Sequence, residues 1–499
     1  MAKLQFFNYV KGLNSAVSPF LQPQGSLTIL NGVNHCYKVG ALLKDLGYSR
    51  KSTQIQANKA VTGLFDFQQD ASTQKMLATI NDATDDDTQL FYMAPAGAWT
   101  EIGAAETAWA NFASITVEME QFIGYCFFVG YGATDGFLPV GSLTGTTFST
   151  VTNVTSMPKA KFIKRFRDRL YIANCQIGST NYPYSVFFSS VPSAGAITWT
   201  VATDFFDVDF NLDITGLGAT YDFLFVFTRE ATFIYDQSQK KEVWKYGCSN
   251  HRTVENYGSY MIWCTGDNIA VSTGGQPQLI GGEIIDFIRN GNAKNFIAKK
   301  IDDEYHLYIG STSCNGISYT NLMATYNFTT NSWRTRELAN TITSLARHFD
   351  NTNWDQRLYM GDSLGSVWDK SKYTDATIAS SDSETTLGTA VTPIHSQFEV
   401  TIPFGSMSLT KGIDNFVAFA NRAGGLRLKG RVVDRNNRAL MEYTEIGELK
   451  EYLNAFSLDI EEGALFQIQG AESGVAPYWS FYGFEVDIEE GGEVAATSD

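Results

Sequence analysis

Few residues of this chain have the types and the spacing that catalysis, cofactor binding or metal binding requires. The sequence contains no GxSxG, HExxH or P-loop motif, and Gly216-Leu217-Gly218 lacks the third glycine of a dinucleotide fingerprint. A sialidase-type glycosidase would need repeated Asp-box turns, and the nearest stretch has Ser363 where the aspartate should stand. The five histidines share no motif and are His35, His251, His306, His348 and His395. We therefore predict no catalytic, cofactor-binding or metal-binding residue, and a pair of carboxylates assembled from distant segments stays an open alternative.

Two clusters of aspartates supply oxygen atoms of the kind that Ca²⁺ prefers. They are Asp82, Asp85, Asp86 and Asp87, and further along Asp204, Asp207, Asp209 and Asp213. Neither spacing matches an EF-hand loop. We interpret both as solvated loop faces, with bound Ca²⁺ as the open alternative.

The net charge of −16 is distributed unevenly along the chain. Residues 1–51 contain a single acid, Asp45, and six basic residues, which are Lys3, Lys11, Lys38, Lys44, Arg50 and Lys51. We predict that these six cations form an interaction surface for a more acidic partner. The acidic remainder cannot bind nucleic acid by neutralising phosphates, but it can repel DNA, which suits a wall past which DNA slides. The alternative is that its acidity only maintains solubility.

Two further groups of residues have structural rather than chemical interpretations. The six cysteines include no CxxC pair and no histidine at zinc spacing, so we expect reduced thiols packed in the core. A basic run with interleaved aromatics spans residues 159–169. Because the chain is acidic, we interpret this run as the outer face of a strand, or as a surface docking onto an acidic neighbour, rather than as a nucleic-acid site.

A unit of two aromatic strands joined by a polar turn recurs along most of the chain. Its first strand occurs seven times at a spacing of roughly 35 to 55 residues, which is typical of β-propeller blades. These strands are residues 89–93, 125–129, 169–173, 223–227, 260–264, 306–310 and 357–361. We predict an all-β protein with a six- to seven-bladed β-propeller over residues 56–380, its first blade interrupted by the loop Asp82 to Asp87. Residues 282–289 are predicted to form a helix inserted between two blades.

The remaining segments differ in composition and in strand pattern from the repeated units. Residues 1–55 are interpreted as an extended N-terminal docking arm, and the Ser/Thr-rich residues 381–390 as a linker. Alternating strands over residues 391–490 predict a C-terminal β-sandwich, followed by an acidic tail at residues 491–499. Since no stretch has the pattern of a signal peptide or a membrane span, we expect a protein made in the cytoplasm without a membrane anchor.

Short stretches distributed over nearly the whole chain carry a resemblance to a known family. In the arm they are Gly12-Leu13-Asn14, Pro19-Phe20-Leu21, Asn31-Gly32-Val33 and the run from Gly40 to Tyr48. Further along they are Phe166 to Ala173, Phe187 to Ser190, Asp207-Val208-Asp209, Ile214 to Leu217, Gly266 to Ile269 and Gly274 to Ile280. With these stretches the chain resembles the tail nozzle, or tail-tube, β-propeller proteins of tailed bacteriophages.

The resemblance implies a structural protein of the virion tail, with neither enzymatic activity nor a cofactor. It implies a homo-oligomeric ring, hexameric in the short-tailed phages, which lies below the portal and the head–tail adaptor. Such a ring extends the channel for DNA ejection, lets double-stranded DNA pass without sequence-specific binding, and can carry tail fibres. We expect the basic arm to bind the ring above.

Two other functions stay open. A host-recognition propeller that binds or cleaves glycans predicts a pocket with clustered arginines or carboxylates. A cellular scaffold propeller predicts a stable monomer.

Overall fold

The computed structural model of the chain is mostly β, with 58% of residues in strands and 6% in helices, which confirms the predicted all-β class. The structure describes residues 2–17, 21–36, 40–45, 47–70, 72–93, 97–208, 212–238, 240–350, 355–370, 381–383, 391–403, 409–421, 425–433, 442–450, 452–463, 465–472 and 479–493.

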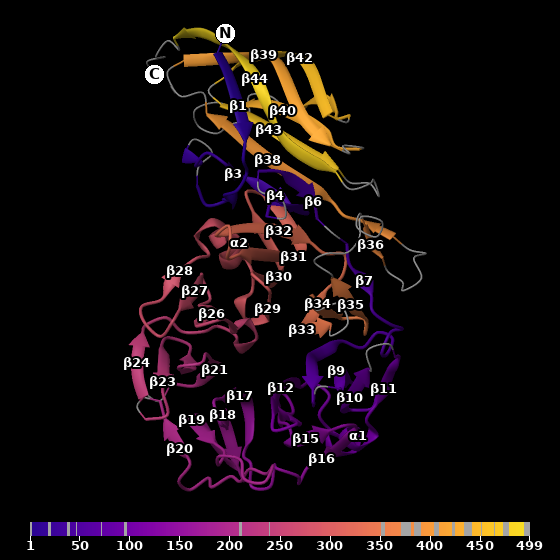
Figure 1. The fold of residues 1–499 in the computed structure, drawn as a ribbon, viewed down its shortest axis with the longest axis vertical. Coiled ribbons are helices and arrows are strands. Elements are labelled where there is room, and N and C mark those ends of the chain that lie inside the picture. Colours follow the sequence, from indigo (N-terminus) through magenta and orange to yellow (C-terminus); the bar gives the residue numbers. More distant parts are fainter. Residues whose placement is uncertain are drawn as a thin grey trace.

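Within these residues, seven successive antiparallel sheets lie around a common centre in the lower part of Figure 1. The first sheet contains β8 (Val61–Gln68), β9 (Gln74–Asp82), β10 (Asp87–Met93) and β11 (Trp99–Glu101). The second contains β12 (Thr116–Phe122), β13 (Tyr125–Gly132), β14 (Gly136–Phe137), β15 (Gly141–Thr144) and β16 (Thr147–Ser149). The third contains β17 (Lys159–Phe166), β18 (Arg169–Ile177), β19 (Thr180–Phe188) and β20 (Phe205–Asp207). The next two contain β21 (Ile214–Ala219), β22 (Leu224–Thr228), β23 (Thr232–Tyr235) and β24 (Lys240–Trp244); and β25 (Glu255–Tyr257), β26 (Tyr260–Cys264), β27 (Ile269–Ser272) and β28 (Gln278–Leu279). The last two contain β29 (Ile297–Ile301), β30 (Glu304–Cys314), β31 (Ile317–Asn327) and β32 (Ser332–Glu337); and β33 (Ile342–Asp350), β34 (Asp355–Asp362) and β35 (Val367–Lys370).

The first strand of each sheet faces the common centre. Each first strand contacts the first strand of the next sheet, from β8 through β12, β17, β21, β25 and β29 to β33, and β33 contacts β8. The seven first strands therefore follow one another in a cycle.

The recurring aromatic strands are not these first strands, so their predicted place in the unit was wrong. Residues 169–173 lie in β18, 306–310 in β30 and 357–361 in β34, which are second strands of their sheets, and residues 89–93 lie in the third strand of the first sheet. The middle strands are covered on both faces by neighbouring sheets, so they contain nearly continuous apolar runs. The innermost strands are more polar because one of their faces borders the centre.

The N-terminal arm is paired with the rest of the chain along much of its length. Its strands are β1 (Ala2–Phe7), β2 (Gly12–Leu13), β3 (Ser26–Leu27), β4 (Ile29–Asn31), β5 (Val33–Asn34), β6 (Leu42–Lys44) and β7 (Ser49–Arg50). β7 pairs with β35 and so adds a fourth strand to the seventh sheet. β7 also pairs with β36 (Ser381–Ser383), which lies in the predicted linker and pairs with β37 (Val391–Pro393).

The C-terminal strands form two further layers, at the top of Figure 1. They are β38 (Ser396–Pro403), β39 (Leu409–Asn421), β40 (Arg427–Val433), β41 (Thr444–Glu448), β42 (Tyr452–Gly463), β43 (Leu465–Glu472) and β44 (Ser480–Glu493). One sheet has the order β42-β39-β44-β6-β5, with β1 paired to β44, and the other continues from β32 through β4 to β38-β43-β40-β41. Phe398 of β38 stacks on Phe481 of β44 at 5.0 Å between ring centres, so the two sheets share an aromatic core.

Short helices connect some of the sheets. The helix predicted at residues 282–289 is present as the 3₁₀ turn η4 (Gly282–Ile284) followed by α2 (Ile285–Asn290). α1 (Gly103–Ala108) follows β11, the 3₁₀ turn η3 (His251–Thr253) precedes β25, and the 3₁₀ turn η5 (Ala293–Asn295) precedes β29. Residues 494–499 of the predicted tail and residues 384–390 of the predicted linker lie outside the described residues.

Candidate functional site

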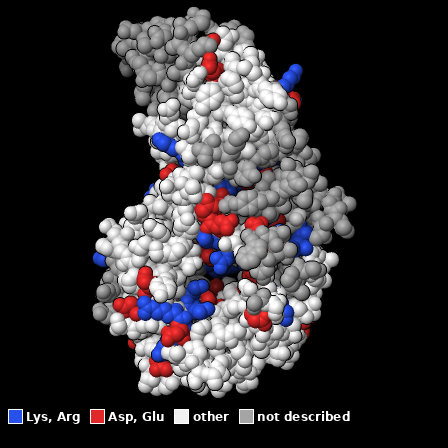
Figure 2. Space-filling view, in the orientation of Figure 1, with Lys and Arg blue, Asp and Glu red and all other residues white. Residues whose placement is uncertain are grey.

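The seven first strands line a central cavity of about 690 Å³. Because side chains alternate across a strand, each first strand directs every second residue toward the centre. Charged residues of this lining include Glu120 of β12, Lys164 of β17, Glu255 of β25 and Lys299 of β29. Figure 2 shows Lys, Arg, Asp and Glu side chains gathered around a hollow in the middle of the lower part of the molecule. The centre is therefore polar although the sheets around it are apolar.

Two ion pairs in the cavity join neighbouring sheets. Lys164 Nζ lies 2.8 Å from Glu120 Oε2, and Lys299 Nζ lies 2.6 Å from Glu255 Oε1. Burial alone would lower the pKa of Lys164, but the Glu120 carboxylate outweighs it and raises that pKa. Each pair thus joins two adjacent inner strands by a charge-assisted hydrogen bond.

Two side chains of η3, His251 and Arg252, cross the centre and form what we call the central plug. Leu217 N–H donates to His251 Nδ1 at 3.2 Å, so the proton of the neutral imidazole is on Nε2, which faces Glu118 Oε2 at 3.5 Å. Burial alone would raise the pKa of Glu118, but the nearby His251 and Arg252 lower it. The plug thereby connects β21 with β12 across the centre.

Arg252 completes the plug on the opposite side. Its Nη2 donates to the carbonyl oxygens of Thr343, at 2.5 Å, and of Thr62, at 3.5 Å. The side chain of Asn250 caps η3 by accepting from Arg252 N–H, and its amide donates to Phe296 O at 2.8 Å. Residues 250–252 therefore contact β33, β8 and the segment before β29 as well as their own sheet.

A second, wider cavity of about 1170 Å³ lies on the other side of the plug. It shares Thr62, Glu118, His251, Arg252 and Ile297 with the first cavity. The rest of its lining comes mainly from the beginnings of the first strands and from the segments that precede them. We call it the wide cavity.

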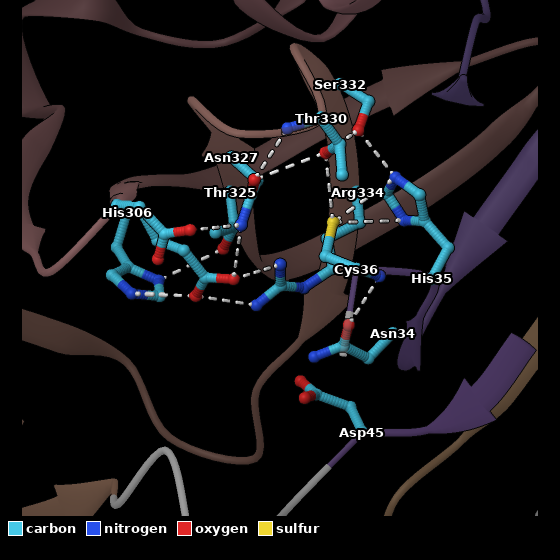
Figure 3. Close-up of polar contacts among 12 residues, drawn as sticks. Asn34, His35, Cys36, Asp45, His306, Thr325, Asn327, Thr330, Ser332 and Arg334 are labelled. Atoms are coloured by element: carbon cyan, nitrogen blue, oxygen red, sulfur yellow. Dashed lines mark hydrogen bonds and ion pairs between the residues drawn. The ribbon is translucent and has the colours of Figure 1, made fainter. Parts of the chain in front are cut away.

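A second polar cluster, the arm clamp, lies where the arm crosses β30–β32 (Figure 3). Arg334 forms a bidentate ion pair with Glu304 at 2.7 and 2.9 Å, and His306 Nε2 lies 3.5 Å from the same carboxylate. From the arm, His35 Nε2 lies 2.7 Å from Ser332 Oγ. Burial lowers the pKa of His306 to about 3 in spite of Glu304, so its ring is neutral at pH 7.

The arm clamp also contains a carboxylate from the arm. Asp45 Oδ2 lies 3.0 Å from Lys370 Nζ and 3.3 Å from Arg336 Nη1. Burial alone would raise the pKa of Asp45, but Lys370 and Arg336 hold it well below its usual range. The one acid of the basic arm therefore forms ion pairs with cations of both the sixth and the seventh sheets.

Cys36 and His35 lie side by side in the arm clamp, an arrangement that raises the question of a cysteine nucleophile. Cys36 Sγ is 3.4 Å from His35 Nε2 and 3.4 Å from Thr330 Oγ1. Burial raises the pKa of the Cys36 thiol, and burial together with Arg334 lowers the pKa of His35 to about 3. Both groups are neutral at pH 7, so the pair lacks the thiolate that nucleophilic chemistry requires.

Three of the six cations predicted as an interaction surface are engaged within the chain. Lys44 is buried, and its Nζ lies 2.6 Å from Glu472 Oε2. The Arg50 guanidinium lies 5.4 Å from the centre of the Trp368 ring, and Lys51 Nζ lies 4.0 Å from Asp369 Oδ2. These three cations therefore interact with residues of the same chain.

The other three cations have different positions. Lys11 is exposed. Lys3 lies in β1 opposite Asp487 of β44, and Lys38 lies outside the described residues. The interaction surface stays a prediction for these three residues.

The remaining sequence interpretations have mixed outcomes. All six cysteines are free thiols and five are buried, as expected. The interpretation of the first aspartate cluster as a solvated loop face was wrong for Asp82 and Asp87, which are buried, Asp82 in an ion pair with Lys59. In the second cluster, Asp209 lies outside the described residues. In the described part of the chain, no group of three His, Cys, Asp or Glu residues is arranged to hold a metal ion, and no helix is long and apolar enough to cross a membrane.

The basic run at residues 159–169 was wrongly interpreted as an outer face. Residues 159–166 of this run form β17, an innermost strand, in which Lys161 lines the wide cavity and Lys164 lines the central cavity. The central plug was not predicted, since the one local sequence signal around η3 is the capping residue Asn250. Comparison with known proteins did not identify a family for the chain. No protein-family model matches it, and no curated protein matches it significantly.

Proposed function

We propose that the seven sheets close into a β-propeller, that the C-terminal layers form a β-sandwich, and that the arm joins them into one rigid subunit of a phage tail nozzle. The cyclic contacts of the first strands support the propeller, because only a closed set of blades brings the last inner strand against the first. The aromatic contact between Phe398 and Phe481 supports the sandwich.

The observation that carries the proposal is the distribution of the arm's contacts. The arm contributes β4 to a continuous sheet between β32 and β38, β6 to the C-terminal sheet beside β44, and β7 to the seventh sheet. A single segment therefore fixes the angle between the propeller and the sandwich. Such rigidity is the property that a subunit of a load-bearing ring needs.

Two of the arm stretches that resemble nozzle proteins, Gly12-Leu13-Asn14 and the run that ends at Tyr48, include residues in close contact with the rest of the subunit. Gly12 has a φ of +61°, and a Cβ there would lie 2.5 Å from the carbonyl oxygen of Trp333. The ring of Tyr48 packs edge-on against Trp368 at 5.3 Å between ring centres. The resemblance therefore falls on residues that hold the subunit together, which is where a shared architecture would constrain a sequence.

The chemistry of the central cavity is also consistent with a structural subunit. In the plug and in the cavity ion pairs, basic side chains contact residues of neighbouring sheets and so hold the sheets together. These side chains are His251, Arg252, Lys164 and Lys299. The net charge of −16 would keep DNA from adhering as it passes through the ring formed by several subunits.

Reconstitution tests the proposal. The full chain is purified, mixed with the portal and adaptor proteins of the same genome, and examined by electron microscopy and native mass spectrometry. We expect a closed ring, hexameric in a short-tailed phage, at the distal end of the adaptor. A chain that stays monomeric with and without the adaptor would overturn the assignment.

A pair of charge reversals tests the docking surface in the same assay. Lys11→Glu reverses an exposed arm cation and should weaken attachment to the adaptor. Arg347→Glu reverses an exposed cation of the central cavity and should leave attachment unchanged. Equal effects of the two variants would exclude the arm as the docking surface.

A further inference from the structure

The wide cavity carries a surplus of positive charge in an acidic protein. Its charged lining consists of Lys161, Lys294 and Arg252 on the positive side and Glu118 on the negative side. Glu118 is already matched by the plug, where it faces His251 and interacts with Arg252. Lys161 and Lys294 are therefore left over, on a chain whose net charge is −16.

Lys161 is the more informative of the two lysines. Its Nζ lies 3.9 Å from the centre of the Tyr131 ring and 5.8 Å from that of Phe137. Among the described residues it has no ion pair, and Asp213 acts on it only through its longer-range charge. A half-buried ammonium held over aromatic rings keeps donors for an anion that enters from the cavity.

Most of the remaining lining consists of amides and hydroxyls. These include Asn81, Ser114, Thr116, Asn292, Asn295 and Thr341. Amides and hydroxyls both donate and accept hydrogen bonds, as sugar hydroxyls do. A phosphate-rich ligand would call for more cations, and a peptide would call for an open strand edge or apolar pockets.

We propose that the wide cavity binds an acidic saccharide whose carboxylate pairs with Lys161 and whose hydroxyls bind the amide-rich wall. The cavity of about 1170 Å³ exceeds the roughly 300–1,000 Å³ of sites for single small molecules, so a segment of an oligosaccharide fits it better than one sugar. The plug residues His251 and Arg252 line both cavities and so form the boundary of the site toward the first cavity. This proposal concerns binding by the isolated chain and does not rest on ring assembly.

The test uses the purified full chain and a panel of oligosaccharides in matched pairs. Each pair joins a uronate or sialate oligosaccharide with its neutral methyl ester, and binding is measured on an array and then by titration calorimetry. We expect at least one acidic member to bind, its ester to bind at least tenfold more weakly, and added salt to weaken binding. If no acidic member binds, or if the esters bind equally well, the proposal is overturned.

A matched pair of lysine variants locates the site. Lys161→Gln should reduce affinity at least tenfold. Lys75→Gln is the control, because Lys75 Nζ also lies over a tyrosine, 5.0 Å from the ring centre of Tyr92, but does not line the wide cavity. Thermal unfolding of both variants checks that they fold alike. Equal binding by the two variants, or binding of a polyglutamate peptide where every saccharide fails, would overturn the proposal.

Discussion

At the scale of single residues, the centre of the molecule depends on a few side chains that satisfy groups from several sheets at once. Arg252 donates to carbonyls of two sheets and interacts with Glu118 of a third. A partly buried guanidinium in such a position is hard to replace, since its loss leaves backbone acceptors without their donor and removes a positive charge near the Glu118 carboxylate.

Arg252→Ala should therefore destabilise the fold by about 3 kcal/mol. The measurement is the shift in the midpoint of urea denaturation. The control is Arg347→Ala, which removes an exposed arginine from the lining of the same cavity and should change stability by less than about 0.5 kcal/mol. Similar losses in the two variants would show that the plug contributes no more than an ordinary surface arginine.

The two buried histidines of the arm clamp predict sensitivity to acid. The pKa values of His35 and His306 are lowered by burial to about 3, below the value of about 6.5 in an unfolded chain. The unfolded state then binds more protons between these values, so stability falls as the pH drops from about 6.5 toward 3. Each histidine contributes at most about 1.4 kcal/mol per pH unit in that window.

Denaturation midpoints between pH 7 and pH 5 measure this effect before most carboxylates titrate. Replacing both histidines, as His35→Gln and His306→Gln, should flatten the dependence on pH even if the starting stability is lower. His395→Gln is the control, because His395 is exposed. A double variant with the slope of the unaltered chain would contradict the assignment of both rings as neutral.

At the scale of elements, the local hydrophobic pattern predicted where many strands and a helix lie, but it did not predict which strands pair with one another. Strands such as β18 and β30 could be read from their apolar runs, and the helix at α2 from its charges and its terminal Asn290-Gly291. The inner strands were missed as a class, because an apolar–polar strand facing a polar cavity has the same pattern as one facing solvent. Lys161 and Lys164 were misplaced for that reason.

The partners of the arm could not be predicted at all. β6 pairs with β44 and β7 with β35, across hundreds of residues, and each contact involves only two residues on the arm's side. Such short strands have no periodicity to reveal, and their register depends on surfaces that exist only after the sheets have formed. The fate of Lys44, which is buried rather than exposed, follows from this pairing.

The role of β7 can be tested at Tyr48, directly before the strand. Tyr48 is buried against Trp368, its hydroxyl accepts from Ala339 N–H at 3.1 Å, and it donates to Asn340 at 3.2 Å. Tyr48→Ala should cost about 3–5 kcal/mol and Tyr48→Phe about 1–2 kcal/mol, measured by chemical denaturation. Tyr221→Ala, at an exposed tyrosine, should be nearly neutral. Tyr48→Ala behaving like Tyr221→Ala would mean that the arm does not stabilise the seventh sheet.

At the scale of the whole molecule, the arm makes separate folding of the two parts unfavourable. One apolar core extends from Ile262 in the fifth sheet, through Trp333, to Phe484 in the C-terminal layers. Removing residues 2–51 would expose part of that core and delete the fourth strand of the seventh sheet. Point substitutions are therefore better probes of the arm than its deletion.

The ion pair between Lys44 and Glu472 tests this coupling directly. Both side chains are buried, so Lys44→Ala removes the cation that lies 2.6 Å from the buried Glu472 carboxylate and should cost about 3–5 kcal/mol. We expect the unaltered chain to unfold in one calorimetric transition, and Lys44→Ala to split it into two as the C-terminal layers unfold first. Replacing both partners together, as Lys44→Met and Glu472→Met, removes the buried charge and should restore much of the single transition. Two transitions in the unaltered chain, or an unchanged single transition in Lys44→Ala, would mean that this ion pair does not couple the unfolding of the seven sheets to that of the C-terminal layers.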